Sequence, residues 1–347
     1  MDLAHLEELA TERLDAVAAD YINRGSADGL TRAANLTAWR RLRLRPHVLR
    51  DVSNVQTATT VLGAPVATPV LIAPTAMQRL AAEDGERATA RAAARVGTVM
   101  VVSMVASCSL EAIAEAAPKA PRWAQMYLLG DRGRTRALAE RARDAGYQAI
   151  VASVDGAAVP YGDHRGATPP PPGGLGNLVP SEPGRPGALL AAMADFDAGV
   201  TPPDLALFRE WSGLPVVVKG VLRGDDAVAC VEAGASAVAV SNHGGRTVDG
   251  CVATGDVLAE VADAVGGRAE VYVDGGIRTG ADVLKALALG ARAVLVGRPA
   301  VWGLAVGGET GVVDVLDAFT RDLARVLAFC GASNLSEVSA DLVVPAP

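Results

Sequence analysis

The residues with the clearest chemical potential stand at the ends of two short apolar runs. The first run ends in PVVVKG and contains Lys219, and the second leads into SNHGGR, which contains His243 and Arg246. A lysine inside an apolar run either forms a Schiff base or gives an anionic ligand a fixed positive charge, and Lys219 alone leaves both open. A lone histidine is often structural, but a base three residues before a carboxylate-binding arginine suits proton or hydride removal beside a carboxylate.

Two further apolar runs end in glycine and arginine. The segments VDGGIRTG and VLVGRP contain Gly276, Arg278, Gly297 and Arg298. Backbone N–H groups, guanidinium groups and a helix start at Gly280 together bind phosphate, as the last two loops of many barrel enzymes do. Either segment alone is equally typical of turn glycines beside a surface arginine. The two together predict a phosphate site.

The apolar runs themselves predict eight buried strands, each followed by an amphipathic helical segment. The expected strands are Val70–Ala76, Thr98–Ser103, Arg122–Leu128, Ala149–Asp155, Pro215–Val221, Ala237–Gly244, Glu270–Ile277 and Ala293–Pro299. They begin 22 to 33 residues apart, which is the spacing of β/α units, except for one step of 66 residues. Eight such units most simply close into an α/β fold, the (β/α)8 TIM barrel. An open doubly wound sheet is the alternative, but the first strand lacks a Gly-rich dinucleotide fingerprint.

The 66-residue step contains a Pro- and Gly-rich segment after the fourth strand, and its length and position predict a lid loop over residues 156–202. Residues 1–69 precede the first strand and predict an N-terminal helical cap. Its expected elements are helices over Leu3–Asn23 and Leu30–Arg40 and a strand-like stretch through Val61. We therefore expect a single domain overall, with the cap over 1–69 and the barrel over 70–347.

Composition excludes several classes of function. The 347 residues carry a net charge of −7, and the 32 basic residues, 29 of them arginine, are scattered, so no nucleic-acid partner is expected. The four cysteines are far apart and form no cluster with histidine, so neither a disulfide framework nor a metal site is expected. The first 20 residues lack the pattern of a signal peptide, and no apolar run is long enough to span a membrane. A cytoplasmic protein without a membrane partner is the expectation.

Short motifs in a fixed order make the sequence resemble the FMN-dependent 2-hydroxy acid oxidase and dehydrogenase family. This family includes glycolate oxidase, lactate oxidase, mandelate dehydrogenase and hydroxymandelate oxidase. SNHGGR at 241–246 matches the family signature, and the motifs that match in the same order are APTAMQ at 73–78, QMY at 125–127, SVD at 153–155, VVKG, DGGIR and GRP. Each match alone is weak, but their shared order is specific. The similarity runs from Asp20 to the C-terminal region.

The resemblance implies an enzyme that oxidises an (S)-2-hydroxy acid to the 2-keto acid, with FMN as cofactor and O2 reduced to H2O2. His243 is implied as the base that takes the α-proton, or the hydroxyl proton in a hydride-transfer version, and Asp155 as the group that stabilises its imidazolium. Arg246 and Tyr21 are implied to bind the substrate carboxylate. Tyr127 is implied to donate a hydrogen bond to the substrate oxygen.

The same resemblance implies the cofactor contacts. Lys219 would lie beside N1 and the C2 carbonyl of the flavin and favour the anionic reduced form, a charge role that fits better than a Schiff base. The other implied contacts around the ring are the Thr75 and Ala76 backbone, Ser103, Gln125 and Ser153, and Ser241 is a further implied cofactor-binding residue. The implied phosphate contacts are Gly276, Arg278, Gly297 and Arg298, with Asp274 orienting the ribityl chain or the loop.

The sequence departs from the family pattern after the fourth strand. The family has a substrate-binding arginine seven residues after the strand-four aspartate, but Gly162 stands there and an arginine follows only at Arg165. Arg165 could supply the second carboxylate contact, His164 could replace it, or that contact is absent. Val105 stands where several members carry a bulky aromatic residue, which predicts a substrate with a sizeable apolar or aryl side chain. Thr247 replaces the common Gln, and nothing physical explains that change.

The electron acceptor and the assembly are implied in the same way. Ala76 resembles the oxidases, whereas membrane-linked mandelate dehydrogenases have Gly there and an apolar segment in the long loop, so O2 is the expected acceptor. A dehydrogenase that passes electrons to another acceptor is the alternative. Two other hypotheses remain open: a barrel that binds FMN or another phosphorylated ligand with lost or altered activity, and a phosphosugar aldolase or isomerase with Lys219 as the amine. Because the family commonly forms tetramers, a homotetramer is implied.

Overall fold

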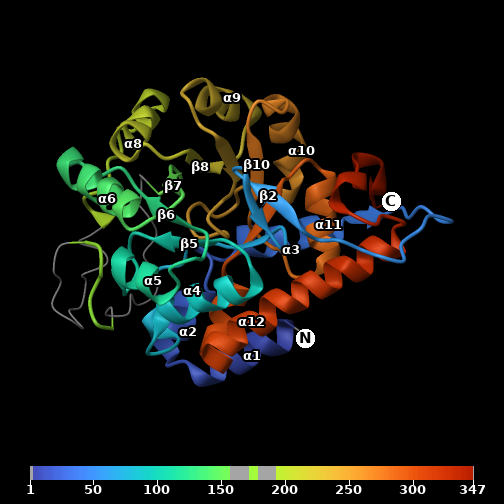
Figure 1. Cartoon of the computed structure of the whole chain (residues 1–347), viewed down its shortest axis with the longest axis horizontal. Helices are drawn as coiled ribbons and strands as arrows, with labels where there is room; N and C mark the ends of the chain where they lie inside the picture. Colours follow the sequence, from blue (N-terminus) through green and yellow to red (C-terminus); the bar gives the residue numbers. More distant parts are fainter. Residues whose placement is uncertain (1–2, 157–171, 179–192, 347) are drawn as a thin grey trace.

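Eight parallel strands form a closed barrel at the centre of this computed structural model, which describes residues 3–156, 172–178 and 193–346. Around the barrel the strand order is β10-β11-β4-β5-β6-β7-β8-β9. The strands are β4 (Val70–Ile72), β5 (Met100–Ser103), β6 (Arg122–Met126), β7 (Ala149–Ser153), β8 (Val216–Val221), β9 (Ala237–Val240), β10 (Glu270–Val273) and β11 (Ala293–Val296). Figure 1 shows them surrounded by helices. The predicted (β/α)8 barrel is confirmed.

Most strands end earlier than the sequence predicts. The predicted Val70–Ala76 ends at Ile72, and the predicted Ala237–Gly244 ends at Val240. The residues that follow leave the hydrogen-bonded ladder and turn over the mouth of the barrel, where they remain in contact with the interior. An apolar run indicates that its residues are buried but not that they form a strand, so periodicity alone cannot locate the ends of the strands.

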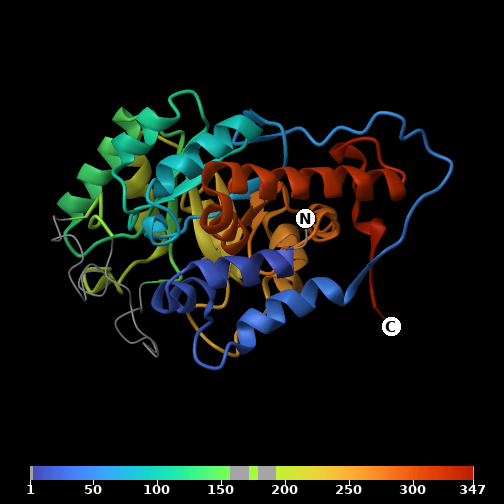
Figure 2. The ribbon, with the colours of Figure 1, turned by 90° about the horizontal axis from the view of Figure 1, so that it is seen from below.

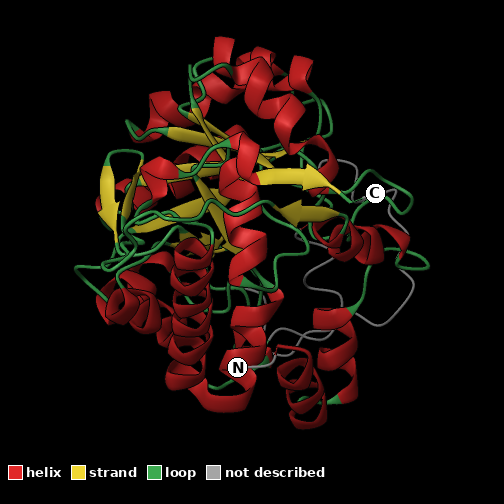
Figure 3. Ribbon diagram, turned by 90° about the vertical axis from the view of Figure 1, so that its right-hand side faces the viewer, coloured by secondary structure: helices red, strands yellow, loops and turns green. Residues whose placement is uncertain are grey.

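Helices cover the outside of the barrel, and Figure 3 shows them around the strands. They are α4 (Gly85–Val96), α5 (Leu110–Ala116), α6 (Arg132–Asp144), α8 (Leu205–Ser212), α9 (Gly224–Glu232), α10 (Thr254–Val265), α11 (Gly280–Ala288) and α12 (Arg298–Phe329). Local sequence fixes their ends: Asp131 accepts two backbone N–H groups at the start of α6, and Thr279 and Asp282 form a capping box on α11. Among the described residues, no helix is long and apolar enough to cross a membrane.

The interior of the barrel is filled from its N-terminal end. Trp123 and Tyr272 meet there with their ring centroids 5.5 Å apart. The hairpin of β2 (Thr59–Val61) and β3 (Ala64–Val66) buries apolar side chains against this interior. Glu270, at the start of β10, accepts the Leu62 N–H in the hairpin turn. Packed side chains thus close this end, and space for a ligand is left at the C-terminal end, where barrel enzymes bind their substrates.

The N-terminal segment forms α1 (Leu3–Arg13), α2 (Ala16–Asn23), α3 (Leu30–Arg40) and the short strand β1 (Leu42–Leu44), besides the hairpin. The prediction of one helix over Leu3–Asn23 was wrong. The chain breaks at Asp15, whose carboxylate accepts the N–H groups of Val17 and Ala18 and so starts a second helix. Strand β1 pairs with β12 (Val343–Pro345), near the C-terminus. Figure 2 shows α1 running beside α12.

Helix α12 connects the barrel mouth to this cap. It begins at Arg298, directly after β11, and it contains non-helical residues at Gly307 and Gly308, where two helices meet at a kink.

Most of the predicted lid over 156–202 lies outside the described residues. Within it, the segment 172–178 is held by Asn177, whose side chain accepts the Leu110 N–H at 2.8 Å and donates to the Cys108 carbonyl at 3.2 Å.

Candidate functional site

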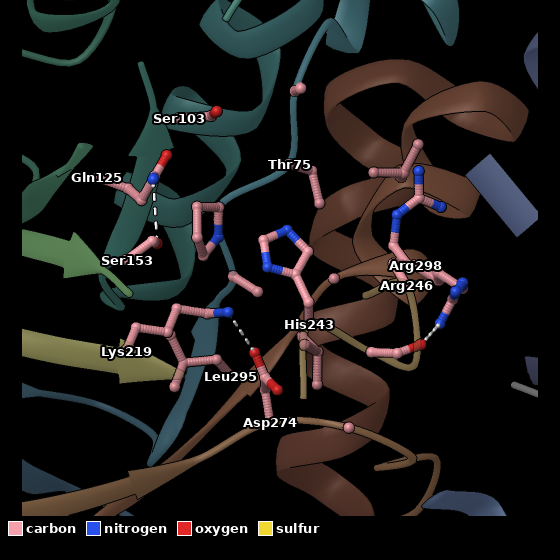
Figure 4. A pocket seen from close by; sticks show the side chains of 18 of the residues that line it. Thr75, Ser103, Gln125, Ser153, Lys219, His243, Arg246, Asp274, Leu295 and Arg298 are labelled. Carbon is pink, nitrogen blue, oxygen red and sulfur yellow. Dashed lines mark hydrogen bonds and ion pairs between the residues drawn. The ribbon is translucent and has the colours of Figure 1, made fainter. Parts of the chain in front are cut away.

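A cavity of about 1250 Å³, including its open mouth, lies at the C-terminal ends of the strands. Its volume exceeds the usual range for small-molecule sites, in part because the mouth is counted. Lys219, His243 and Arg246 all line it, so the three groups singled out in the sequence share one site. The predicted residues that also line it are Tyr21, Thr75, Ala76, Ser103, Gln125, Tyr127, Ser153, Asp274, Gly276, Arg278, Gly297 and Arg298. Figure 4 shows His243 between the Lys219–Asp274 pair and the arginines.

His243 and Asp155 form a hydrogen-bonded pair at the cavity. His243 follows β9 in the left-handed backbone conformation, with φ at 58°, and its N–H donates to Ser241 Oγ at 3.1 Å. Such strain in a residue other than glycine is typical of functional sites. The ring Nδ1 lies 3.1 Å from both carboxylate oxygens of Asp155, which follows β7. The carboxylate keeps a proton on Nδ1 and leaves Nε2 as an acceptor, so the pair is built as a base with its orienting acid.

Asp155 lies tightly against strand β8. Gly220 has φ at 116°, and a Cβ built on it would lie 2.6 Å from Asp155 Cβ, so only glycine allows this approach. Burial opposes ionisation of Asp155, but the charges of His243 and Lys219 outweigh it and lower the pKa of the carboxyl group. A depressed pKa means that the stabilisation by this carboxylate is present at neutral pH and is lost as the pH falls through its folded pKa.

Lys219 is buried and has two polar partners. Its Nζ donates to Ser241 Oγ at 2.9 Å and lies 3.1 Å from Asp274 Oδ2. Burial lowers the pKa of Lys219, but Asp274 and Asp155 outweigh that effect and raise it above the usual value. A Schiff-base lysine needs a neutral amine, so this environment favours the fixed-charge interpretation. Asp274 lines the cavity, and its Oδ1 is buried and has no hydrogen-bond partner among the described residues.

Polar side chains on neighbouring strands line the wall beside Lys219. The strand register places Ser103 next to Gln125, and Ser153 next to Lys219. Gln125 donates to Ser153 Oγ at 3.0 Å and accepts the Met104 N–H at 3.3 Å (Figure 4). Inward-facing polar groups in a barrel of apolar strands are costly unless they are paired, and these are also open to a ligand. This wall can bind a flat polar group through several hydrogen bonds.

The opposite end of the cavity is strongly positive. Arg298 donates to the carbonyl groups of Ile22, Arg24 and Gly244 at 2.9 to 3.2 Å. Burial, followed by the charges of neighbouring arginines, lowers the pKa of Arg298 well below its usual value, and burial lowers that of Arg278 to about 10. Guanidinium groups keep their protons, so this crowding of like charge is relieved when an anion binds. The Arg278 guanidinium also lies 5.0 Å from the Trp302 ring centroid.

Arg246, Tyr21 and Tyr127 lie around His243. Arg246 Nη1 donates to the carbonyls of Tyr21 at 2.8 Å and Arg24 at 3.2 Å, and its guanidinium lies 5.0 Å from the Tyr21 ring centroid. Burial lowers the pKa of Arg246. Burial and then the charge of Asp155 raise the pKa of Tyr127, so its hydroxyl remains a donor at neutral pH. An acid beside His243 would meet a guanidinium and two phenols.

Two predicted residues lie behind the cavity wall. Asp155 and Ser241 reach the cavity through His243 and Lys219, to which they are hydrogen-bonded. Arg165 falls outside the described residues, as do His164 and Gly162.

Three contributions to the site were not predicted from the sequence. Met193 and Phe196 line the cavity, but they lie in the long segment after the fourth strand, where no helix or strand was predicted. Asn35 and Asn242 exchange two amide hydrogen bonds of 2.8 Å, and this pair ties the SNHGGR loop to α3. In the sequence, the position of Asn242 directly before His243 could have indicated this pair. The backbone acceptors of the cap could not be found from side-chain motifs.

The residues present fit FMN. Arg278 and Arg298 form a crowded positive end that suits the phosphate, and the unpartnered Asp274 Oδ1 suits a ribityl hydroxyl. Lys219 and the paired Gln125 and Ser153 form a polar wall with a fixed charge, which suits the heteroatoms of a flavin ring. The fit is chemical: each part of the cofactor has a matching region of the same cavity.

Comparisons with known proteins agree with this geometry. Residues 10–345 match the family described as FMN-dependent dehydrogenase. The chain is 45% identical over 351 residues to the L-lactate oxidase of Nostoc sp., covering 97% of this chain and 96% of that protein. It is 43% identical over 339 residues to 2-hydroxyacid oxidase 1 of Homo sapiens, covering 93% and 91%. A crystal structure of mandelate oxidase with (S)-4-hydroxymandelic acid superposes with a TM-score of 0.88, 37% identity and coverage of 98% and 97%.

Site geometry and comparisons thus lead to the same family. A match over nearly the whole chain with identities above 40% covers the barrel, the cap and every motif discussed above. The chain belongs to the FMN-dependent 2-hydroxy acid oxidase family and is an FMN-dependent oxidoreductase of 2-hydroxy acids.

Proposed function

We propose that this chain oxidises an (S)-2-hydroxy acid to the 2-keto acid and transfers the two electrons to O2, which becomes H2O2. The observation that carries this proposal is the His243–Asp155 pair, with Nδ1 3.1 Å from both carboxylate oxygens, in the same cavity as Arg246 and Lys219. The arrangement supplies a base, a carboxylate binder and a fixed positive charge. These are the groups that removal of hydrogen from a 2-hydroxy acid requires.

The side chains act on the substrate as follows. Arg246 and Tyr21 bind the substrate carboxylate and so bring C2 toward His243. His243 Nε2 takes the α-proton, or the hydroxyl proton in a hydride transfer, and Asp155 stabilises the imidazolium that forms. The Tyr127 hydroxyl donates a hydrogen bond to the substrate oxygen. When bound, FMN would supply the two-electron redox chemistry that this oxidation requires.

The remaining predicted residues hold the cofactor. Lys219 supplies positive charge beside the ring, and the charges of Asp274 and Asp155 keep it protonated despite its burial. The other proposed ring contacts are the Thr75 and Ala76 backbone, Ser103, Gln125 and Ser153, and Ser241 acts on the cofactor through Lys219. The proposed phosphate contacts are Gly276, Arg278, Gly297 and Arg298, with Asp274 toward the ribityl chain. A second carboxylate contact from Arg165 or His164 stays a proposal, because both lie outside the described residues.

Mixing the purified protein, which bound FMN should make yellow, with a 2-hydroxy acid in the absence of oxygen tests both the reduction of the cofactor and the electron acceptor. We expect loss of the visible flavin absorbance, and on admission of air we expect its return with stoichiometric H2O2. Bleaching that air does not reverse but a redox dye does would assign a dehydrogenase with another acceptor. A yellow protein that no 2-hydroxy acid bleaches would be a binding protein without this activity, and a colourless one would lack the cofactor.

We further propose a substrate with a sizeable apolar or aryl side chain. Val105 and Met193 line the cavity, and each presents an apolar surface. We expect kcat/KM to rise from glycolate through lactate to a longer or aryl 2-hydroxy acid. The rise should be about 10-fold or more for every few methylene groups that the larger substrate side chain buries. Val105→Trp fills this space and should reverse the order, with Val99→Ile, inside the barrel, as the control. Highest turnover on glycolate by the unaltered enzyme would rule the proposal out.

The assembly, location and domain organisation are proposed as well. A homotetramer is supported by resemblance alone, and a cytoplasmic location by the wide separation of the four cysteines. A single domain, with residues 1–69 as its cap and 70–347 as its FMN-binding barrel, is supported by the cap carbonyls that accept from Arg246 and Arg298. Sedimentation of the purified protein would measure the first of these directly.

A further inference from the structure

Phe196 contacts Tyr127 face to face at the cavity. Their ring centroids are 4.1 Å apart with an interplanar angle of 17°, and the two side chains are 5% and 8% exposed. Both rings line the cavity. Gly156 also approaches the Tyr127 ring so closely that a Cβ there would lie 2.5 Å from Tyr127 Cε1 and 3.1 Å from its hydroxyl oxygen. The ring that carries the hydroxyl is thus stacked on Phe196 and lies close to the Gly156 backbone.

The segment that carries Phe196 is fastened to the end of strand β6. Leu129 and Phe196 form an antiparallel bridge, the Gly130 N–H donates to the Asp195 carbonyl at 2.8 Å, and the Asp197 N–H donates to the Leu128 carbonyl at 2.8 Å. Tyr127 directly precedes this bridge in the chain. The two stacked rings therefore belong to two backbones that are hydrogen-bonded to each other.

Two ion pairs flank Phe196. Asp195 pairs with Arg134, and Asp197 pairs with Arg132 at 2.5 Å. Both arginines lie in the first turn of α6, two residues apart, and the acids lie on either side of Phe196. Partly exposed pairs of this kind contribute little stability, so we assign them a geometric role: they hold the segment 195–197 against the start of α6. We call Asp195, Asp197, Arg132 and Arg134 the clamp.

We infer that Phe196 is a positioning residue of the oxidation, which holds the Tyr127 hydroxyl toward the substrate oxygen, and that the clamp fixes Phe196 in place for this task. The inference rests on the proposed function, because Tyr127 acts on the substrate there. A phenol free to turn about its side-chain bonds would spend part of its time away from the substrate oxygen. Stacking on a fixed ring removes that freedom before the substrate binds.

The test is a double-mutant cycle between Phe196→Met and Tyr127→Phe, measured as kcat/KM for the preferred 2-hydroxy acid. Met keeps much of the volume but not the ring, and Phe keeps the ring at 127 but not the hydroxyl. We expect Phe196→Met to lower kcat/KM by about 2- to 10-fold, the range of aromatic pair energies. In the Tyr127→Phe background the same change should have almost no further effect, because no hydroxyl remains to be positioned.

Two further variants separate positioning from a loss of structure. Phe196→Tyr keeps the stacked ring and should retain nearly all of kcat/KM, whereas Phe196→Leu should behave like Phe196→Met. Arg134→Gln releases one half of the clamp and should lower kcat/KM in the unaltered protein but not in Phe196→Met. Flavin content and thermal midpoint, measured on every variant, would detect one that fails to fold.

The outcomes distinguish this inference from the proposed function. If the effects of Phe196→Met and Tyr127→Phe on kcat/KM multiply, or if Phe196→Met leaves kcat/KM unchanged, the inference is overturned. The bleaching experiment can still succeed in either case. If no 2-hydroxy acid bleaches the flavin, the proposed function fails on its own. The cycle is then read from the Kd of oxalate, an unreactive dicarboxylate, followed by its perturbation of the flavin absorbance. Coupling between the two substitutions in that Kd would show that Phe196 positions the Tyr127 hydroxyl toward a bound acid, whereas independence would overturn the inference.

Discussion

Replacing His243 by Gln is expected to lower kcat by about 10²- to 10⁴-fold while the protein keeps its FMN. Gln retains a hydrogen bond to Asp155 but has no nitrogen that accepts a proton at neutral pH. The rate of flavin bleaching by a 2-hydroxy acid without oxygen measures this step directly. It also avoids any effect of the substitution on reoxidation.

The chain offers a matched control for this variant. His47 Nε2 lies 3.4 Å from Asp341 on the protein surface, so His47→Gln removes a histidine from another His–Asp pair away from the cavity. It should leave the bleaching rate unchanged. Asp155→Asn should reproduce much of the loss in His243→Gln, because an amide no longer requires the proton to stay on Nδ1. Bleaching of His243→Gln at nearly the original rate would mean that another group is the base.

Replacing Arg246 by Met is expected to lower kcat/KM for 2-hydroxy acids by about 10²- to 10⁴-fold. A carboxylate held by two charge-assisted hydrogen bonds gains about 1.5 to 3 kcal/mol from each, and both are lost together. If Arg246 binds the ground state and the transition state equally, the loss falls on KM and kcat is retained. Steady-state kinetics over a range of substrate concentrations separate the two parameters.

Two comparisons make the Arg246 result specific. Arg246→Lys keeps a positive charge but not the planar fork, so it should fall between the original protein and Arg246→Met. Arg209→Met removes an exposed arginine on α8 and should change neither parameter. An unchanged KM and kcat in Arg246→Met would show that the substrate carboxylate binds elsewhere in the cavity, and would direct attention to Arg165.

The sequence was sufficient for the fold because the information is local. Most barrel strands are buried on both faces and are rich in Val, Ile and Ala, and eight such runs at β/α spacing have few ways to pair. The ends were less accurate, because burial continues past the last ladder bond. The break at Asp15 was also available, as an N-capping residue before Ala16, but the apolar spacing continues across it.

The site was partly predictable for the same reason. Residues at the C-terminal ends of parallel strands must meet at one end of a barrel, so Lys219, His243 and Arg298 could be grouped from their positions beside the apolar runs alone. The contacts between these residues and their partners could not be predicted. Lys219 Nζ is shared between Ser241 and Asp274 because of strand register and side-chain direction, and no spacing in the chain encodes either of these.

The sequence by itself determined the barrel, the order of its strands and the chemical types gathered at its mouth, since these depend on periodicity and on residues beside strand ends. Only the tertiary structure decided which atoms face one another. The left-handed turn at His243, the carbonyls of the cap on Arg246 and Arg298, and Phe196 stacked on Tyr127 all join segments far apart in the chain. Contacts of that kind are fixed by the packing of the whole molecule, so they cannot be predicted from local sequence.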